Sequence, residues 1–285
     1  MNRLALSTRA AIIRCLTDGM GIRATARTMQ VSKGAVTRIL EDSGQFAAIY
    51  SDLKLRGLRC PTLEFDEQWS FVHTKQSRAK QPEHGDIYTF AAFATESKLV
   101  VSWLVGDRSS ESTDAFVEGV ASRTVGRVQI STDGWQAYPD AISHYFGYTR
   151  ADYAIVVKKY ENDGDVEAQR RYGLARVKSM EKVRMIGTPD METAGTSGVE
   201  NMHLHVRQKC RRFARLTNMH SKDVQHHALA VSLNFFAHNF MRVHSGLNKI
   251  NGKGITPAMM HDLADRPLSA EWLAEAITPE SVTIK

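Results

Sequence analysis

Apolar residues near the amino terminus recur with the spacing of short helices. The pattern predicts helices over 7–18, 22–29 and 33–41, each with one apolar face. Residues 19–21 break the first two helices apart with two glycines. Residues 30–32 form a turn that ends in Ser32, a residue suited to cap the third helix. A short helix, a tight turn and a second helix is typical of a helix-turn-helix unit.

From Pro61 onward the pattern changes to apolar runs of strand length separated by polar breaks. Three runs in succession predict an antiparallel meander, and a helix over 110–123 then precedes two further strands. This order predicts an α/β domain with a mixed five-stranded sheet flanked by helices, preceded by an all-α unit. The expected strands cover residues 65–72, 86–96, 99–106, 127–131 and 153–157.

Charge is distributed unevenly along the 285 residues. The net charge is +6, and residues 1–60 alone contain ten Lys and Arg against four acids, so the remainder is formally neutral. A basic amino-terminal unit on a balanced body favours a polyanionic partner. The three cysteines are isolated, which favours a reducing cytoplasm, and no apolar run reaches the length of a membrane span.

The predicted third helix would present its first turn to the major groove of double-stranded DNA. Lys33 and Thr37 are the candidates for contacts with base edges, and Arg23, Arg27 and Arg38 are the candidates for contacts with flanking phosphates. A purely structural three-helix unit would have a similar pattern. We expect a DNA-binding domain over 1–44 and a linker over 45–60.

Two aspartates occupy positions where an uncompensated charge would be costly. Asp66 lies inside the first predicted strand, and Asp133 lies just past the end of the fourth. If these strands are neighbours, the two carboxylates lie side by side, and a divalent cation would relieve their repulsion. Mg²⁺ is commonly held by one or two carboxylates together with water and substrate phosphates.

A third acid is expected from a helix packed across the same edge of the sheet. Glu200 lies in the first turn of a helix that begins near Ser197, where the helix dipole favours negative charge. His203 and Arg207 share its face. The following residues are rich in cations, which favours a phosphate clamp over the alternative of a solvated basic face. These cations are Arg207, Lys209, Arg211, Arg212 and Arg215.

Together these segments resemble the DDE transposases of the insertion-sequence-one type. The resemblance rests on FDEQWSFV with Asp66, STDGWQAY with Asp133, and SGVENMHLHVRQKCRRFARLT with Glu200, and it extends to FFAHNFMRVHSGLNKINGKGITPAMM. It implies an RNase H-like fold that binds two Mg²⁺ ions, replaceable by Mn²⁺, through Asp66, Asp133 and Glu200. It also implies that His203 and Arg207, on the face of Glu200, contact the cleaved DNA strand or orient the glutamate. It also implies an endonuclease and strand-transfer activity on terminal inverted repeats and target DNA, by a homodimer or larger homo-oligomer.

The interval between Asp133 and Glu200 is longer than in compact members of that family. The surplus covers about 159–197 and includes a predicted hairpin over 175–187. We expect the catalytic domain over 61–265, with a tail over 266–285. Two other functions stay open: a catalytically silent DNA-binding regulator with an RNase H-like domain, and a structure-selective nuclease. Only the enzymes need the acids at one metal site.

Overall fold

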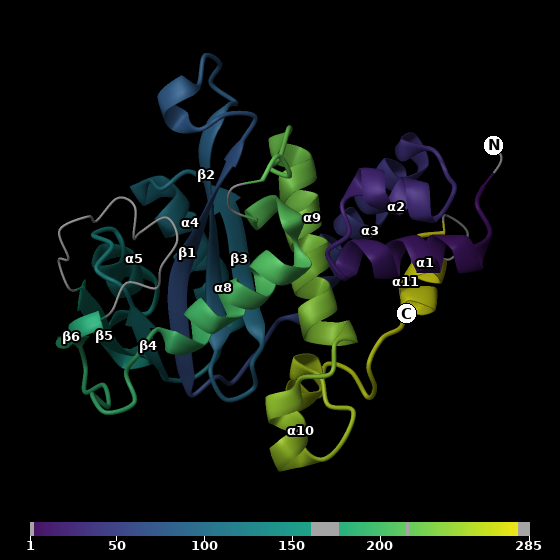
Figure 1. Cartoon of the computed structure of the whole chain (residues 1–285). Helices are drawn as coiled ribbons and strands as arrows, with labels where there is room; N and C mark the ends of the chain where they lie inside the picture. The colour runs from purple at the N-terminus through teal and green to yellow at the C-terminus, as the bar shows by residue number, and fades with distance from the viewer. Residues whose placement is uncertain (1–2, 161–176, 215–216, 279–285) are drawn as a thin grey trace.

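The computed structural model describes residues 3–160, 177–214 and 217–278, and it shows a mixed six-stranded sheet with helices on both faces (Figure 1). The strand order is β3-β2-β1-β4-β5-β6. The first and fourth strands are therefore neighbours, which is the condition under which the two aspartates can lie side by side. The strands are β1 (Thr62–Val72), β2 (Gly85–Ala94), β3 (Val100–Gly106), β4 (Val128–Thr132), β5 (Ala151–Tyr160) and β6 (Val177–Ile186).

The first three strands form the predicted antiparallel meander. Strands β4 and β5 then run parallel to β1, and β6 returns antiparallel to β5. The prediction of five strands was wrong, because the segment expected to be a hairpin is one continuous strand. Between Val177 and Ile186 there is no Gly, Pro, Asn or Asp to form a tight turn, so the chain stays extended and pairs with β5.

Each face of the sheet is covered by helices that bury a separate hydrophobic cluster. On one face α4 (Ser110–Arg123) and α5 (Tyr138–Tyr145) pack against β1, with Phe116 and Tyr138 against Phe65. On the other face α8 (Ser197–Lys209) and α9 (Val224–Phe236) cover β1 to β3. Because α8 crosses β1 and β2, residues of its amino-terminal half reach the centre of the sheet (Figure 1).

The amino-terminal helices are α1 (Leu6–Thr17), α2 (Ile22–Thr28) and α3 (Lys33–Lys54), with the Ser32 side chain capping α3 as expected. Helix α3 continues well past Glu41, so the segment expected to be a linker is largely helical. Tyr50 explains this continuation, because its ring packs against Phe236, Phe240 and Trp272. These aromatic contacts stabilise the additional turns of the helix.

The carboxy-terminal segment returns to the amino-terminal helices. Helix α11 (Ala270–Ala276) packs on α1, where Arg9 donates a hydrogen bond to the carbonyl of Ala274 at 2.9 Å. Within the described residues, no helix combines the length and apolar character that crossing a bilayer requires. The remaining short elements are η1 (Gln76–Arg78), α6 (Gly147–Arg150), η2 (Arg211–Phe213), η3 (Ala237–Met241), α10 (Ser245–Asn251) and η4 (Pro257–His261).

Candidate active site

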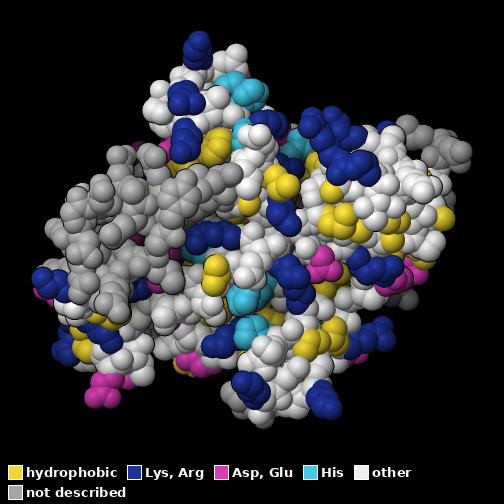
Figure 2. All heavy atoms as spheres, viewed as in Figure 1, with side chains coloured by type: hydrophobic (Ala, Val, Ile, Leu, Met, Phe, Trp, Pro, Cys, Tyr) yellow, Lys and Arg dark blue, Asp and Glu magenta, His cyan; other side chains and the backbone are white. Residues whose placement is uncertain are grey.

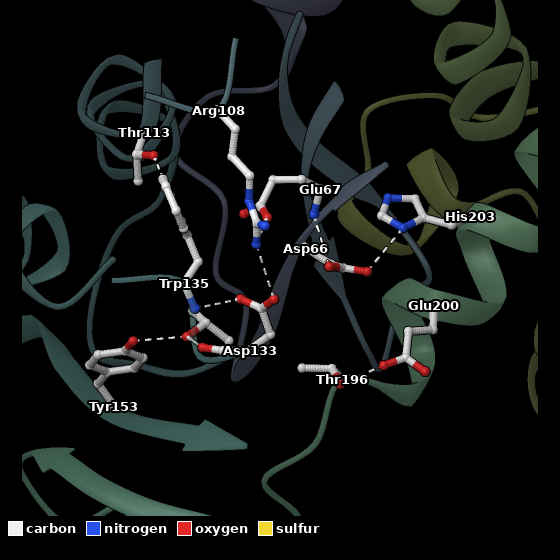
Figure 3. A network of polar contacts seen from close by, with 11 residues as sticks. Asp66, Glu67, Arg108, Thr113, Asp133, Trp135, Tyr153, Thr196, Glu200 and His203 are labelled. Atoms are coloured by element: carbon white, nitrogen blue, oxygen red, sulfur yellow. Dashed lines mark hydrogen bonds and ion pairs between the residues drawn. The ribbon is translucent and has the colours of Figure 1, made fainter. Parts of the chain in front are cut away.

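Three carboxylates gather where β1 and β4 separate. The two strands pair only over Thr62–Glu64, whereas β1 continues to Val72 paired with β2 on its other side. Asp66 and Glu67 therefore lie on an open strand edge, and Asp133, one residue beyond β4, lies beside them. One oxygen from each of the three carboxylates falls within 4.8 Å of the others (Figure 3). We call Asp66, Glu67 and Asp133 the acidic cluster.

Burial sets the electrostatics of the acidic cluster. The Glu67 side chain is 2% exposed. Burial raises its pKa to about 7, and the nearby Asp133 charge adds to the rise, while the Tyr138 hydroxyl and Arg108 oppose it. Burial also raises the pKa of Asp133, although the backbone N–H of Trp135 stabilises the charged form by donating to its Oδ1 at 3.0 Å. The cluster thus concentrates carboxyl groups whose charged forms are disfavoured by burial and by one another.

Arg108 supplies one positive charge from the loop between β3 and α4. Its Nη2 lies 3.1 Å from Oε2 of Glu67 and 3.5 Å from Oδ2 of Asp133. The guanidinium stacks on the ring of Trp135, 4.4 Å from the centroid. Trp135 in turn donates its indole N–H to Oγ1 of Thr113 at 2.9 Å, which fixes the ring on α4 (Figure 3).

His203 connects α8 to the acidic cluster. Its Nδ1 lies 3.1 Å from Oδ2 of Asp66, and its backbone carbonyl accepts a hydrogen bond from the Gln68 amide at 3.2 Å. The sequence placed His203 on the face of Glu200, with a role towards a DNA strand or the glutamate. In the structure its hydrogen bond is to Asp66. Its buried Nε2 has no hydrogen-bond partner among the described residues.

Glu64 holds the first turn of α8 against β1. Its Oε2 accepts the backbone N–H of Val199 at 2.7 Å, and burial raises the pKa of this carboxyl group. Gly198 is needed for this approach, because a Cβ there would lie 2.9 Å from the same oxygen. Sequence analysis missed Glu67, an acid in the same predicted strand as Asp66, and Glu64, which lies one residue before that predicted strand. No comparable signal distinguished Arg108.

Glu200 lies in the first turn of α8, as predicted, but outside the acidic cluster. Its carboxylate is exposed, receives a hydrogen bond from Thr196 at 2.9 Å and forms an ion pair with Lys158. Figure 3 shows it on the same helix as His203, with its carboxylate bonded to Thr196. The structure thus brings Asp66 and Asp133 together, with Glu67 as the third carboxylate of the cluster.

The predicted phosphate clamp has partners within the protein. Lys209 forms an ion pair with Asp18 at 3.1 Å, and Arg211 donates to the carbonyl of Gly19 at 3.2 Å. Arg212 donates to the hydroxyl of Ser221 at 3.2 Å. These side chains therefore link α8 and η2 to the α1–α2 turn and to the chain before α9. Arg207 is half-buried on α8, and Arg215 lies outside the described residues.

The cations of α2 and α3 lie at the surface. Arg23, Arg27, Lys33 and Arg38 are exposed, and Thr37 is half-buried. In Figure 2 Lys and Arg side chains gather over the part of the molecule that α2 and α3 occupy in Figure 1. This placement leaves the residues predicted to contact DNA accessible to a partner.

Neither the protein-family models nor the curated proteins with which the chain was compared include a match. The residues of the acidic cluster themselves indicate which ion could bind there. An all-oxygen donor set suits a hard divalent cation such as Mg²⁺ or Mn²⁺. One oxygen from each carboxylate lies within 4.8 Å of the others, so a single ion could contact all three side chains. The acidic cluster fits a divalent cation.

Proposed function

We propose that this protein is a DNA transposase that cleaves and joins DNA strands at the acidic cluster. The observation that carries the proposal is the convergence of Asp66, Glu67 and Asp133 at the separation of β1 and β4. Three antiparallel strands followed by two parallel ones, with helices on both faces, are compatible with the RNase H-like fold. The three sequence motifs that resemble those of DDE transposases support the same assignment.

The residues of the cluster would hold one or two Mg²⁺ ions, which supply positive charge at the attacked phosphate and at the leaving oxygen. His203 orients Asp66, and the N–H of Trp135 orients Asp133. Both contacts restrict carboxylate rotation, so they preorganise the oxygens that bind the ion. Glu200, which lies outside the acidic cluster and pairs with Lys158, is the further catalytic carboxylate that the sequence resemblance implies, on a helix whose first turn Glu64 anchors to β1.

The exposed amino-terminal cations would bind the ends of the transposon. Lys33, which is exposed, and Thr37, which is half-buried, lie in the first two turns of α3, the part of the helix that would enter the major groove and contact base edges. Arg23 and Arg27 lie on α2 and would bind flanking phosphates. Cutting two ends in one event requires at least two copies of the chain, so we propose a homodimer on double-stranded DNA.

The experiment uses the full-length protein, Mn²⁺ or Mg²⁺, and duplex DNA from the flanks of the open reading frame, where terminal inverted repeats would lie. Wild-type protein should nick these ends and join them to a plasmid, whereas Asp66→Asn, Asp133→Asn and Glu200→Gln should not. Asp140→Asn changes an exposed acid on α5 and should remain active. Cleavage by Asp133→Asn, or the absence of cleavage by wild type, would refute the proposed transposase activity.

A catalytically silent DNA-binding regulator is the second candidate. Two observations favour it: Arg108 already neutralises part of the cluster, and Glu200 is paired with Lys158. This function requires DNA binding without cleavage. It also predicts that Asp133→Asn binds the terminal DNA as tightly as wild type and that added Mn²⁺ changes neither protein.

A further inference from the structure

Arg108 lies on a loop that is fixed from both sides. Asp107 accepts a hydrogen bond from the Ser109 hydroxyl at 2.7 Å, and the Ser109 side chain caps α4 by accepting the N–H of Ser112. The guanidinium lies over the ring of Trp135 and 5.8 Å from the centroid of Tyr88. The loop and the two rings direct the side chain into the acidic cluster, and Figure 3 shows Arg108 pointing towards Glu67 and Asp133.

The two ion pairs of Arg108 differ in length and in accessibility. The pair with Glu67 is shorter, at 3.1 Å, and this carboxylate is 2% exposed. The pair with Asp133 is 3.5 Å long, and that carboxylate is 38% exposed. Solvent weakens an ion pair and gives other cations access to its anion. Asp133 is therefore the ligand that a cation arriving from solvent could take from Arg108.

We propose that Arg108 is an exchangeable counter-ion of the acidic cluster. It neutralises Glu67 and Asp133 when no divalent cation is bound, and it yields Asp133 to that cation while Trp135 and Glu67 retain the guanidinium. The inference rests on the metal site of the proposed function and adds a residue that regulates its loading. Because the guanidinium and the divalent cation compete for Asp133, Arg108 lowers the affinity of the site for metal.

The first test is calorimetric titration of Mn²⁺ into full-length wild type, Arg108→Ala, Arg108→Lys and Arg127→Ala. Arg127 is a matched control because it also pairs with an aspartate, Asp152. It lies just before the start of β4, whereas the acidic cluster lies past the end of this strand. Arg108→Ala should bind Mn²⁺ about tenfold more tightly than wild type, equivalent to about 1.4 kcal/mol. Arg108→Lys should fall between them, because lysine keeps the charge without the planar stack on Trp135.

Arg127→Ala should match wild type. Equal affinities for Arg108→Ala, Arg127→Ala and wild type would overturn the exchange while leaving the metal site intact. Absence of Mn²⁺ binding by both wild type and Arg108→Ala would overturn the metal site itself, so the two failures are distinguishable. Asp133→Asn should lose most of the affinity and thereby assign the titrated ion to this cluster.

The second test observes the guanidinium directly in the wild-type protein, which makes it independent of the folding of any alanine variant. The Nε–H signal of Arg108 in a ¹⁵N spectrum is assigned by its absence from Arg108→Lys. Titration with diamagnetic Mg²⁺ should shift this signal, and the midpoint of the shift should equal that of Mg²⁺ binding measured by calorimetry. The Arg127 signal should stay in place. A signal of Arg108 that does not respond to saturating Mg²⁺ would contradict the exchange.

Discussion

The Nδ1 atom of His203 lies 3.1 Å from Oδ2 of Asp66, so α8 contacts the acidic cluster through a histidine on its buried face. The carboxylate of Asp66 is thereby held from one side by the imidazole and from the other by the backbone N–H of Glu67, which donates to Oδ1 at 2.9 Å. Two hydrogen bonds at different oxygens fix the plane of this carboxylate.

Replacing His203 should therefore impair metal binding and strand cleavage without abolishing them. Loss of a hydrogen bond that orients a metal ligand costs about 10- to 100-fold in affinity or activity. His203→Ala should lose activity in this range, and His203→Gln should recover part of it because an amide can still donate to Asp66. The measurements are the nicking rate and the Mn²⁺ affinity.

His205→Ala provides the control for this prediction. His205 is exposed on the same helix, so its replacement changes helix propensity and the helix surface without touching Asp66. It should leave the nicking rate and the Mn²⁺ affinity at their wild-type values. Equal losses in the two variants would show that α8 responds to any substitution, and the specific role of His203 would be refuted.

Glu67 should make the stability of the protein depend on pH. Its pKa rises from 4.5 to about 7 on folding, so the folded state binds the proton more tightly than the unfolded state. The free energy of unfolding should then fall as pH increases from about 4.5 to 7, and level off above. Glu67→Gln removes this titration. From pH 5 to pH 8, its free energy of unfolding should therefore increase by about 2–3 kcal/mol relative to that of wild type.

Urea unfolding at pH 5 and pH 8 checks this difference. Glu118→Gln is the matched control, since Glu118 is an exposed glutamate on α4. For that variant, the difference from wild type should be the same at both pH values. A constant difference for Glu67→Gln as well would show that this carboxyl group titrates alike in the folded and unfolded protein.

A divalent cation should stabilise the folded protein, and more strongly above pH 7 than below it. Deprotonated Glu67 and Asp133 are better ligands, and the ion binds the folded state alone. At a concentration 100 times the dissociation constant the gain is about 2.7 kcal/mol. Thermal unfolding at pH 8 should show a rise in Tm with Mn²⁺ that EDTA reverses. The rise should be smaller at pH 5 and absent in Asp133→Asn.

The positions of Asp66 and Asp133 could be predicted because both depend on local patterns. An acid in an apolar strand and an acid just after a strand mark one edge of a sheet once the two strands are neighbours. Strand β6 could not be predicted in the same way. Its sequence mixes charged and apolar residues, and the absence of a turn-forming residue favours one long strand only where a neighbour such as β5 is there to pair with it.

The partners of the long basic side chains could not be predicted at all. Lys209 and Arg211 meet Asp18 and Gly19, which lie about 190 positions away in the sequence. Such contacts depend on how α8 packs against the amino-terminal helices, and charge alone does not distinguish a protein partner from a phosphate. Arg108 is a similar case, because its ion-pair partners lie on β1 and just past the end of β4, far from it in the sequence.

Gly19 should be the most sensitive position of the contact between α8 and the α1–α2 turn. Its φ is +89°, and a Cβ there would lie 2.7 Å from the carbonyl oxygen of Gln208. Gly57 distinguishes the cost of a positive φ from the cost of a steric clash. Its φ is +65°, but a Cβ there would meet no atom within 4 Å. Gly57→Ala should cost about 1 kcal/mol, as expected for a left-handed residue that gains a Cβ.

Gly19→Ala should cost more, because the backbone of α8 has to move away from the turn. We expect a total loss of about 2–4 kcal/mol in the free energy of unfolding. The movement should also disturb the ion pair between Lys209 and Asp18, so Asp18→Asn should cost less in the Gly19→Ala background than in wild type. Urea unfolding of the two glycine variants, Asp18→Asn and the Gly19→Ala/Asp18→Asn double variant measures both effects. Equal losses for Gly19→Ala and Gly57→Ala would show that backbone conformation, and not contact with α8, determines the role of Gly19.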